Sequence, residues 1–362
     1  MREGQHYLQT QGVVQWSTPS NIAIVKYWGK KGVQEPLNPS VSFTLHKART
    51  LTRVEFEHRG ISNNPSVELW LDGQPMPSFQ PKISKFLIHL TPFFPWVNHF
   101  HLRIDTHNTF PHSSGIASSA SGMACLAFCL AEMGTLIQES APAVSSLLVS
   151  GIARLGSGSA CRSVHGGWNL WGRTDALPNS SDSFAVPLTK VSPAFQSIQD
   201  TILILHGEQK RLSSSDGHQL METHPYRDSR IAQANDHTRQ LLEALATDDW
   251  ATFGQIAESE ALSLHALMVN SREGYTLLAE SSWEAIYRVR DFRKSTGIPV
   301  YFTFDAGPNM HLLYPEAHLK RVDEFVQDQL LPLCENHTCI EDHIGAGPKK
   351  LKKETSLYTQ AL

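Results

Sequence analysis

A run of small residues lies in the first half of the chain, between a predicted strand and a predicted helix. It reads Pro-His-Ser-Ser-Gly-Ile-Ala-Ser-Ser-Ala-Ser-Gly from Pro111 to Gly122. Small side chains let backbone N–H groups approach a ligand closely, and a helix N-terminus adds free amides and the positive end of its dipole. The run therefore predicts a phosphate-binding loop, although a helix packed tightly on a sheet would have the same composition. It contains neither the G-x-x-x-x-G-K-[ST] P-loop nor the G-x-G-x-x-G dinucleotide fingerprint.

The order of the predicted elements indicates the fold class. Early in the chain, β-rich and apolar spacing predicts strands at 13–16, 22–27, 41–45, 67–71 and 102–105 and helices at 82–90, 118–133 and 142–155. Later segments predict a strand at 201–206, helices at 230–246, 250–269 and 282–294, strands at 300–304 and 310–314, and a solvated basic tail at 349–353. Strands first and helices later favour an α+β fold. A Ser-, Asp-, Asn- and Pro-rich stretch at 175–183 suggests two lobes, 1–190 and 191–362.

The composition excludes several classes of protein. With 31 Lys and Arg against 35 Asp and Glu, the net charge is −4, so no basic surface for nucleic acid or an anionic membrane is expected. On charge alone, an anionic ligand is not expected either. The longest uncharged apolar run, Met123 to Ala131, is half of a membrane span, and 1–15 lacks the apolar core of a secretory signal. Five Cys without a C-x-x-C pair favour a reducing, cytoplasmic compartment.

Four further segments combine turns with groups suited to anions or to acid–base chemistry. Each also has a plain structural interpretation: an exposed arginine, a solvated serine turn, a charged sheet edge or an aspartate that caps a turn. The segments are Gly156 to Ser163, Leu212 to Gly217, Lys26 to Lys31 and Asp305 to Asn309.

Taken together and in order, these segments resemble the diphosphomevalonate decarboxylase family of the GHMP kinase superfamily. The resemblance is carried by Asn-Ile-Ala-Ile-Val-Lys-Tyr-Trp-Gly-Lys at 21–30, by 115–122, by 156–162 and by Asp-Ala-Gly-Pro-Asn at 305–309. It runs collinearly from about Ser20 to Pro348, which is nearly the whole chain.

The resemblance implies the GHMP kinase fold, with two lobes and a deep cleft. The expected lobes are a ribosomal protein S5 domain 2-like N-terminal lobe and a ferredoxin-like C-terminal lobe. The implied reaction is the ATP-dependent decarboxylation of (R)-5-diphosphomevalonate to isopentenyl diphosphate, ADP, phosphate and CO2, with ATP and Mg2+. A homodimer is expected on the same basis.

The resemblance also assigns residues. Asp305 is expected to act at the substrate 3-hydroxyl, Arg162 to bind the substrate carboxylate, and Lys26 to keep Asp305 ionised. Lys82, by its spacing after the Asp72-Gly73 turn, is expected to join Tyr27, Lys30, Ser214 and Ser215 on the diphosphate. The substrate-binding set is Asn21, Tyr27, Trp28, Gly29, Lys30, Lys82, Ser157, Gly158, Ser159, Ala160, Cys161, Arg162, Ser214 and Ser215. The nucleotide-binding set is Ser113, Ser114, Gly115, Ala117, Ser118 and Ser119, and no protein cage for a metal is expected.

Alternatives on the same fold stay open at this point. A sibling enzyme would act on mevalonate or mevalonate 5-phosphate, and a non-catalytic sensor would keep the pocket without turnover. A serine hydrolase is not supported, because the chain has no G-x-S-x-G motif.

Overall fold

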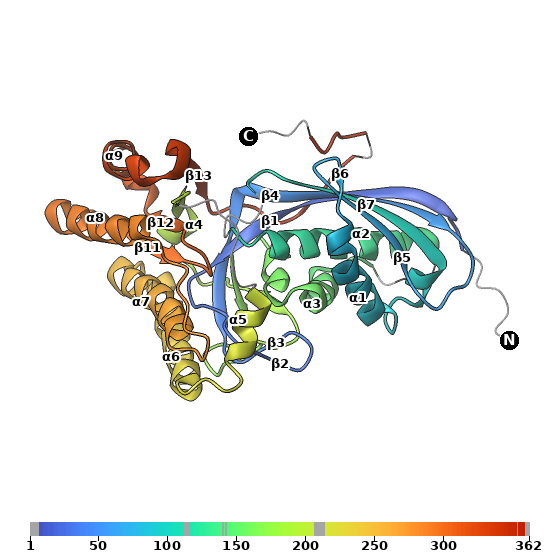
Figure 1. The fold of residues 1–362 in the computed structure, drawn as a ribbon, viewed down its shortest axis with the longest axis horizontal. Helices are drawn as coiled ribbons and strands as arrows, with labels where there is room; N and C mark the ends of the chain where they lie inside the picture. The colour runs from blue at the N-terminus through green and yellow to red at the C-terminus, as the bar shows by residue number, and fades with distance from the viewer. Residues whose placement is uncertain are drawn as a thin grey trace.

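The computed structural model describes residues 7–111, 116–139, 141, 143–205, 214–352 and 354–358. Within these ranges the chain forms two lobes, each built on its own sheet (Figure 1). An eight-stranded sheet belongs mainly to the first half of the chain, and a four-stranded sheet belongs to the second half. The predicted α+β class is confirmed.

Two long antiparallel strands, β1 (Gln11–Ala23) and β4 (Ser40–His58), form the centre of the large sheet. The order across it is β14-β1-β4-β7-β5-β6, with β8 on β4 and β9 on β8, and β5 runs parallel to β7. The other bounds are β5 (Ser66–Leu71), β6 (Gln74–Pro75), β7 (Phe100–Asn108), β8 (Trp168–Trp171), β9 (Ala185–Pro187) and β14 (Lys349–Lys350). Apart from this sheet, β2 (Lys30–Lys31) and β3 (Glu35–Pro36) form a small hairpin.

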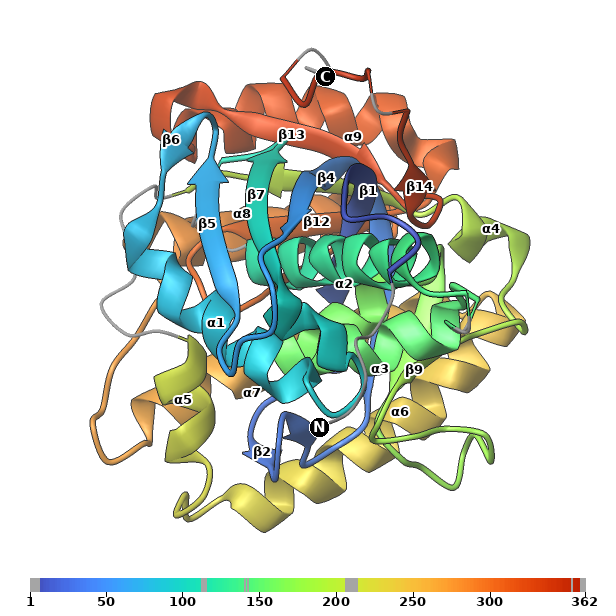
Figure 2. The same cartoon turned by 90° about the vertical axis from the view of Figure 1, so that its right-hand side faces the viewer.

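Three helices cover one face of the large sheet: α1 (Gln80–Leu90), α2 (Ser118–Ile137) and α3 (Ser146–Gly156) (Figure 2). A 3₁₀ turn, η3 (Gly158–Ser163), follows α3 directly. Among the described residues, α2 alone is long and apolar enough to span a membrane, yet 83% of its most apolar window is buried inside the fold. Burial against β1 and β4 accounts for its apolar composition as a core helix.

The second lobe places helices beside the antiparallel sheet β11-β12-β10-β13. Its strands are β10 (Gln199–Leu203), β11 (Tyr301–Phe304), β12 (Met310–Tyr314) and β13 (Cys339–His343). Its helices are α4 (Pro193–Gln196), α5 (Ser214–Leu220), α6 (Arg227–Thr247), α7 (Trp250–Val269), α8 (Glu280–Thr296) and α9 (Leu319–Phe325). The side chain of Asp249 caps α7 by accepting the Thr252 N–H at 3.0 Å, and Gly297 ends α8 with a φ of 71°.

One apolar core is shared between the lobes. Phe43 and Ile22, from the large sheet, pack in the same cluster as Phe195, Phe253 and Leu313 of the second lobe. The register of β1 against β4 shifts between Pro19 and Asn21, which is a bulge that bends β1 at the point where it reaches the second lobe. The lobes are therefore joined by buried side chains.

Several predicted elements need correction. The strand expected at 22–27 ends at Ala23, because the N–H groups of Ile24 and Val25 both donate to the Val41 carbonyl, which breaks the regular ladder. The backbone of Lys26 then bonds to side chains of the second lobe. The tail expected to be solvated contains β14, where Lys349 and Lys350 pair with β1. The hairpin turn at Asp72-Gly73 forms as predicted, with φ values of 51° and 76°.

Candidate active site

A cavity of about 870 Å³ is lined by residues of both lobes. Its wall contains many residues of the two predicted sets: Lys26, Tyr27, Trp28, Lys30, Lys82, Ala117, Ser118, Ser119, Ser157, Gly158, Ser159, Arg162 and Asp305. Four residues of the substrate set are buried beside this wall without lining it: Asn21, Gly29, Ala160 and Cys161. Ser214 and Ser215 begin α5, where only their backbone is described, and Ser113, Ser114 and Gly115 lie outside the described residues.

Lys26 and Asp305 form an ion pair at the cavity wall. Lys26 Nζ lies 2.8 Å from Asp305 Oδ1 and also donates to the Ala23 carbonyl at 2.5 Å. Burial alone would raise the pKa of Asp305, but the charge and hydrogen bond of Lys26 overcome that effect and lower it. Burial lowers the pKa of the Lys26 ammonium, and the carboxylate opposes that shift. The pair therefore presents an ionised carboxylate to the cavity.

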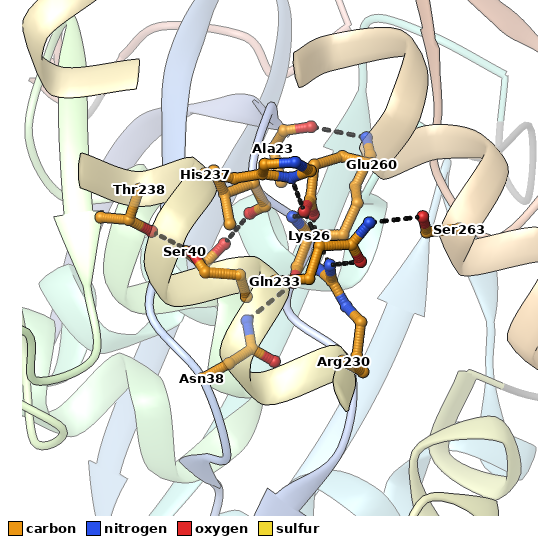
Figure 3. Close-up of polar contacts among 12 residues, drawn as sticks. Ala23, Lys26, Asn38, Ser40, Arg230, Gln233, His237, Thr238, Glu260 and Ser263 are labelled. Atoms are coloured by element: carbon orange, nitrogen blue, oxygen red, sulfur yellow. Dashed lines mark hydrogen bonds and ion pairs between the residues drawn. The ribbon is translucent and has the colours of Figure 1, made fainter. Parts of the chain in front are cut away.

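The backbone of Lys26 is held by a buried network, shown in Figure 3. Glu260 Oε2 accepts the Lys26 N–H at 2.8 Å, and a guanidinium N–H of Arg230 donates to the Lys26 carbonyl at 3.0 Å. Arg230 also contacts Glu260 at 2.5 Å, and His237 Nδ1 lies 2.6 Å from the same carboxylate. Asn38 donates a second hydrogen bond to the Lys26 carbonyl, at 3.0 Å. The backbone N–H and the backbone carbonyl of Lys26 are therefore both hydrogen-bonded, although Lys26 lies outside any strand.

Asp305 follows β11. Its backbone is anchored by α7, the same helix whose Glu260 holds the backbone of Lys26. His265 Nε2, on α7, lies 3.1 Å from the Asp305 carbonyl oxygen. The peptide then turns, and the Gly307 N–H donates to that carbonyl at 2.7 Å. These two hydrogen bonds fix the backbone of Asp305 and so set the position of its carboxylate at the end of β11.

Arg162 is 4% exposed and comes from η3, directly after α3. Its Nε donates to Asn21 Oδ1 at 3.2 Å, and a terminal nitrogen donates to the Ser40 hydroxyl. Asn21 in turn donates to the Ser163 hydroxyl at 2.8 Å. Burial lowers the pKa of Arg162, although a guanidinium stays charged in proteins. Asn21 therefore orients the guanidinium that lines the cavity.

The charge of the cavity wall is strongly positive. Its described lining has four cationic side chains, from Lys26, Lys30, Lys82 and Arg162, against the single carboxylate of Asp305. Loss of hydration and the neighbouring Lys30 charge both lower the pKa of Lys82. A chain with a net charge of −4 thus concentrates positive charge where an anion would bind.

Tyr27 adds a neutral donor to this wall. Its ring packs edge-on against Trp171, with the centroids 4.7 Å apart. Its buried hydroxyl has no hydrogen-bond partner among the described residues, and burial raises the pKa of this hydroxyl, so it stays protonated. Gly158 allows this approach, because a Cβ there would lie 2.9 Å from the Tyr27 oxygen.

The N-terminus of α2 opens into the same cavity. Ala117, with a φ of 49°, turns the chain into this 20-residue helix, and Ser118 and Ser119 form its first turn. Free amides and the helix dipole at this point favour a phosphate group. Within the described ranges, no group of three or more His, Cys, Asp and Glu side chains could hold a metal ion.

The sequence prediction did not include three side chains that organise the site: Glu260, Arg230 and His218. Glu260 and Arg230 lie in helices that were predicted only as helices, and no local pattern marks their partners. His218 lines the cavity next to Tyr27 and Trp28. Its position directly after the serine-rich segment 212–217 was the one signal that could have identified it.

Comparison with known proteins agrees with the resemblance. Residues 18–185 match the diphosphomevalonate decarboxylase-like N-terminal domain, and residues 201–360 match the mevalonate 5-diphosphate decarboxylase C-terminal domain. The diphosphomevalonate decarboxylase of Candida albicans is 32% identical over 336 residues, which cover 89% of this chain and 87% of that protein.

Solved structures extend the agreement to the fold. The complex of MDDEF with MVAPP, AMPPCP and magnesium aligns with a TM-score of 0.80 at 27% identity, covering 95% of this chain and all of that one. Mevalonate diphosphate decarboxylase from Staphylococcus aureus gives the same TM-score and identity over 96% of this chain and 100% of its own. The expected GHMP kinase fold is confirmed. The chain belongs to the diphosphomevalonate decarboxylase family.

Proposed function

We propose that this protein catalyses the ATP-dependent decarboxylation of (R)-5-diphosphomevalonate to isopentenyl diphosphate, ADP, phosphate and CO2. The observation that carries the proposal is the Lys26–Asp305 pair, held at 2.8 Å in a cavity that Arg162 also lines. This arrangement offers one group to each end of a β-hydroxy acid: a carboxylate to its hydroxyl and a cation to its own carboxylate.

The chemistry explains why ATP is required. A β-hydroxy carboxylate has no ketone to accept the electrons of the breaking C–C bond, so its C3 needs a good leaving group. Transfer of the γ-phosphoryl group to the tertiary hydroxyl supplies that leaving group. As phosphate departs with the C–O electrons, C3 becomes electron-poor. The C–C electrons then form the new double bond and release CO2.

Asp305 acts at the 3-hydroxyl in this scheme. Because the pKa of Asp305 is lowered, the carboxylate is ionised at neutral pH and can accept the hydrogen bond or proton of the hydroxyl. Its negative charge also stabilises the electron-poor C3 that develops later. Lys26 holds this carboxylate in one orientation from a buried position.

Arg162 binds the carboxylate that leaves as CO2. A guanidinium donates two parallel hydrogen bonds to a carboxylate, which fixes its plane. Asn21 and Ser40 orient this guanidinium, so the C–C bond that breaks can be held in line with the departing phosphate.

The phosphate groups are assigned to the rest of the wall. Lys30, Lys82 and Tyr27 bind the diphosphate of the substrate, and the start of α2 binds the nucleotide phosphates. The hydroxyls of Ser118 and Ser119 would help to hold Mg2+ beside the nucleotide phosphates, because they are hard oxygen donors that suit this ion. When bound, the ion neutralises charge on the transferred phosphoryl group.

A coupled assay of ADP release tests the function. Mevalonate, mevalonate 5-phosphate and 5-diphosphomevalonate are compared, with CO2 and phosphate measured in parallel. We expect the diphosphate to be preferred, and Asp305→Asn to lower turnover about 10³-fold while substrate binding is retained. Equal turnover of the monophosphate would assign the sibling activity instead. ADP without CO2 would indicate a 3-kinase, and no product from any of the three would indicate a sensor.

Three further features belong to the same proposal. Residues 1–190 and 191–362 are the two lobes, with the metabolite site between them. The protein works in the cytoplasm and as a homodimer. Size-exclusion chromatography with light scattering will test the oligomeric state.

A further inference from the structure

His218 lies in the cavity wall and has no role in the scheme above. It is half-buried on α5, with its ring centroid 4.3 Å from that of Tyr27 and 4.7 Å from that of Trp28. Both neighbours belong to the segment that leads to Lys30 in the diphosphate-binding wall. The imidazole is thus a polar group placed where the substrate's most charged part is expected.

The hydrogen bond to Gly29 defines which nitrogen of His218 carries the proton. The Gly29 N–H donates to His218 Nδ1 at 2.9 Å, so Nδ1 must present its lone pair. In a neutral imidazole the hydrogen is then on Nε2. Burial and the charges of Lys30 and Arg162 lower the pKa of His218 to about 3, which keeps the ring neutral. With Nδ1 occupied, Nε2–H is the polar hydrogen left for a ligand.

Close packing holds α5 against residues 27–29. A Cβ at Gly217 would lie 2.5 Å from the Trp28 ring, so only glycine permits this contact. Gly29, with a φ of +88°, packs in the same way, since a Cβ there would meet Leu37 at 2.6 Å and Met221 at 3.0 Å. Close packing at Gly217 and at Gly29 therefore fixes the position of the His218 imidazole.

We propose that the His218 Nε2–H group donates a hydrogen bond to a phosphoryl oxygen of the substrate diphosphate. This inference rests on the proposed function, and it assigns His218 as a specificity residue beside Tyr27 and Lys30. A neutral donor suits this position, because Lys26, Lys30, Lys82 and Arg162 already supply positive charge to the cavity wall. Histidine adds a hydrogen bond to the anion without adding a fifth charge.

Three substitutions separate the donor from the packing of the ring. His218→Asn places an acceptor near the position of Nδ1 but leaves nothing near Nε2. His218→Gln places an amide near Nε2, and His218→Phe keeps a ring without either nitrogen. A hydrogen bond to a charged group corresponds to about a 10- to 100-fold change in affinity. We therefore expect His218→Asn and His218→Phe to weaken binding of 5-diphosphomevalonate by that factor, and His218→Gln to retain most of the affinity.

Calorimetric titration of the full-length variants measures these affinities, with ADP as a second ligand. ADP binding should change less than twofold in all three. The matched control is His58→Asn, which alters an exposed histidine outside the cavity and should leave both affinities unchanged. The proposal would be overturned if His218→Asn bound the substrate as tightly as the parent. It would also be overturned by an equal loss of substrate affinity in His218→Asn and His218→Gln, or by a parallel loss of ADP affinity, since either would indicate a role in packing alone.

Nuclear magnetic resonance of ¹⁵N-histidine protein gives a readout independent of turnover. We expect His218 to show the neutral Nε2–H tautomer at pH 7, and inorganic pyrophosphate to shift this resonance and slow its exchange. An unchanged resonance at saturating pyrophosphate would contradict the assignment. If the parent protein released no CO2 from the diphosphate, the proposed function would fail, while the pyrophosphate titration would still decide the role of His218.

Discussion

Glu260 and His265 lie five positions apart on α7 and each holds the backbone of one member of the Lys26–Asp305 pair. Glu260 accepts the N–H of Lys26 at 2.8 Å, and His265 contacts the carbonyl of Asp305 at 3.1 Å. Five helical residues span about 7.5 Å, and a helix is stiff over that length. One buried helix therefore sets the spacing between two segments that are far apart in sequence.

Loss of the Glu260 charge should affect both stability and turnover. In Glu260→Gln the buried guanidinium of Arg230 loses its counter-charge, which costs about 3–5 kcal/mol of unfolding free energy. The backbone of Lys26 also loses a charged acceptor, so we expect kcat to fall about tenfold. Urea unfolding and the ADP-release assay measure the two effects.

The same helix supplies the control for this variant. Glu258 is buried and paired with Arg290 and Arg293, and it does not line the cavity. Glu258→Gln should lose stability while kcat stays within twofold of the parent. If both variants lost the same fraction of kcat, the link between Glu260 and Lys26 would be wrong.

Glu260 should also contribute to acid unfolding. Burial would raise its pKa, but Arg230 and His237 overcome this and lower the pKa to about 2. A lowered folded-state pKa stabilises the protein above the unfolded-state value near 4.5, and this stabilisation is lost as the pH falls toward 2. The unfolding free energy of the parent should therefore fall between pH 5 and 3 more steeply than that of Glu260→Gln. Parallel curves for the two proteins would rule out this contribution.

Removal of the Lys26 charge should move the acid limb of the pH–rate profile. In Lys26→Met, burial still raises the pKa of Asp305, and the largest opposing effect is lost, while the smaller effects of His311 and Arg162 remain. More of the carboxylate is then protonated at a given pH, so kcat/KM should begin to fall at a higher pH than in the parent.

Lys31→Met is the matched control for this experiment. Lys31 is half exposed and pairs with Asp182 at 3.0 Å, away from the cavity. Its acid limb should coincide with that of the parent. If the acid limb of Lys26→Met lay at the same pH as that of the parent, a group other than Asp305 would control it.

The carboxylate role of Arg162 predicts a difference between substrate and product. Arg162→Lys keeps the charge but loses the planar fork, so binding of 5-diphosphomevalonate should weaken about 10- to 100-fold. Isopentenyl diphosphate has no carboxylate, and its affinity should stay nearly constant. Arg154→Lys, at a buried arginine bound to the Ser183 carbonyl, controls for loss of structure. An equal loss of affinity for both ligands would indicate that Arg162 binds the diphosphate instead of the carboxylate.

Local patterns were enough to find the main strands and helices, but not the polar network around Lys26. The bounds of α7 were predicted at 250–269 and found there, since apolar spacing and the cap at Asp249 are local signals. Which side of α7 faces which lobe cannot be read from spacing, because it is buried on several faces. Glu260 in such a helix has the same sequence context whether it is paired or solvated.

The two ends of the ion pair illustrate the same limit. Lys26 and Asp305 are separated by 279 positions, and no short-range rule connects them. Each was singled out locally, and the resemblance alone suggested their proximity. Sequence patterns assign no role to His218, because a single histidine has no pattern and its significance depends on Gly29 and on the cavity.

The short strand β14 has a consequence for any attempt to divide the chain. Lys349 and Lys350, which follow the whole second lobe, pair with Ser17 and Trp16 of β1, and Lys350 lies 2.6 Å from Glu132 on α2. A fragment that stopped near residue 190 would leave the outer side of β1 uncovered. An unpaired strand edge of this kind is a template for intermolecular pairing and aggregation. The two half-chains should therefore stay soluble only when they are produced together, as complementing fragments.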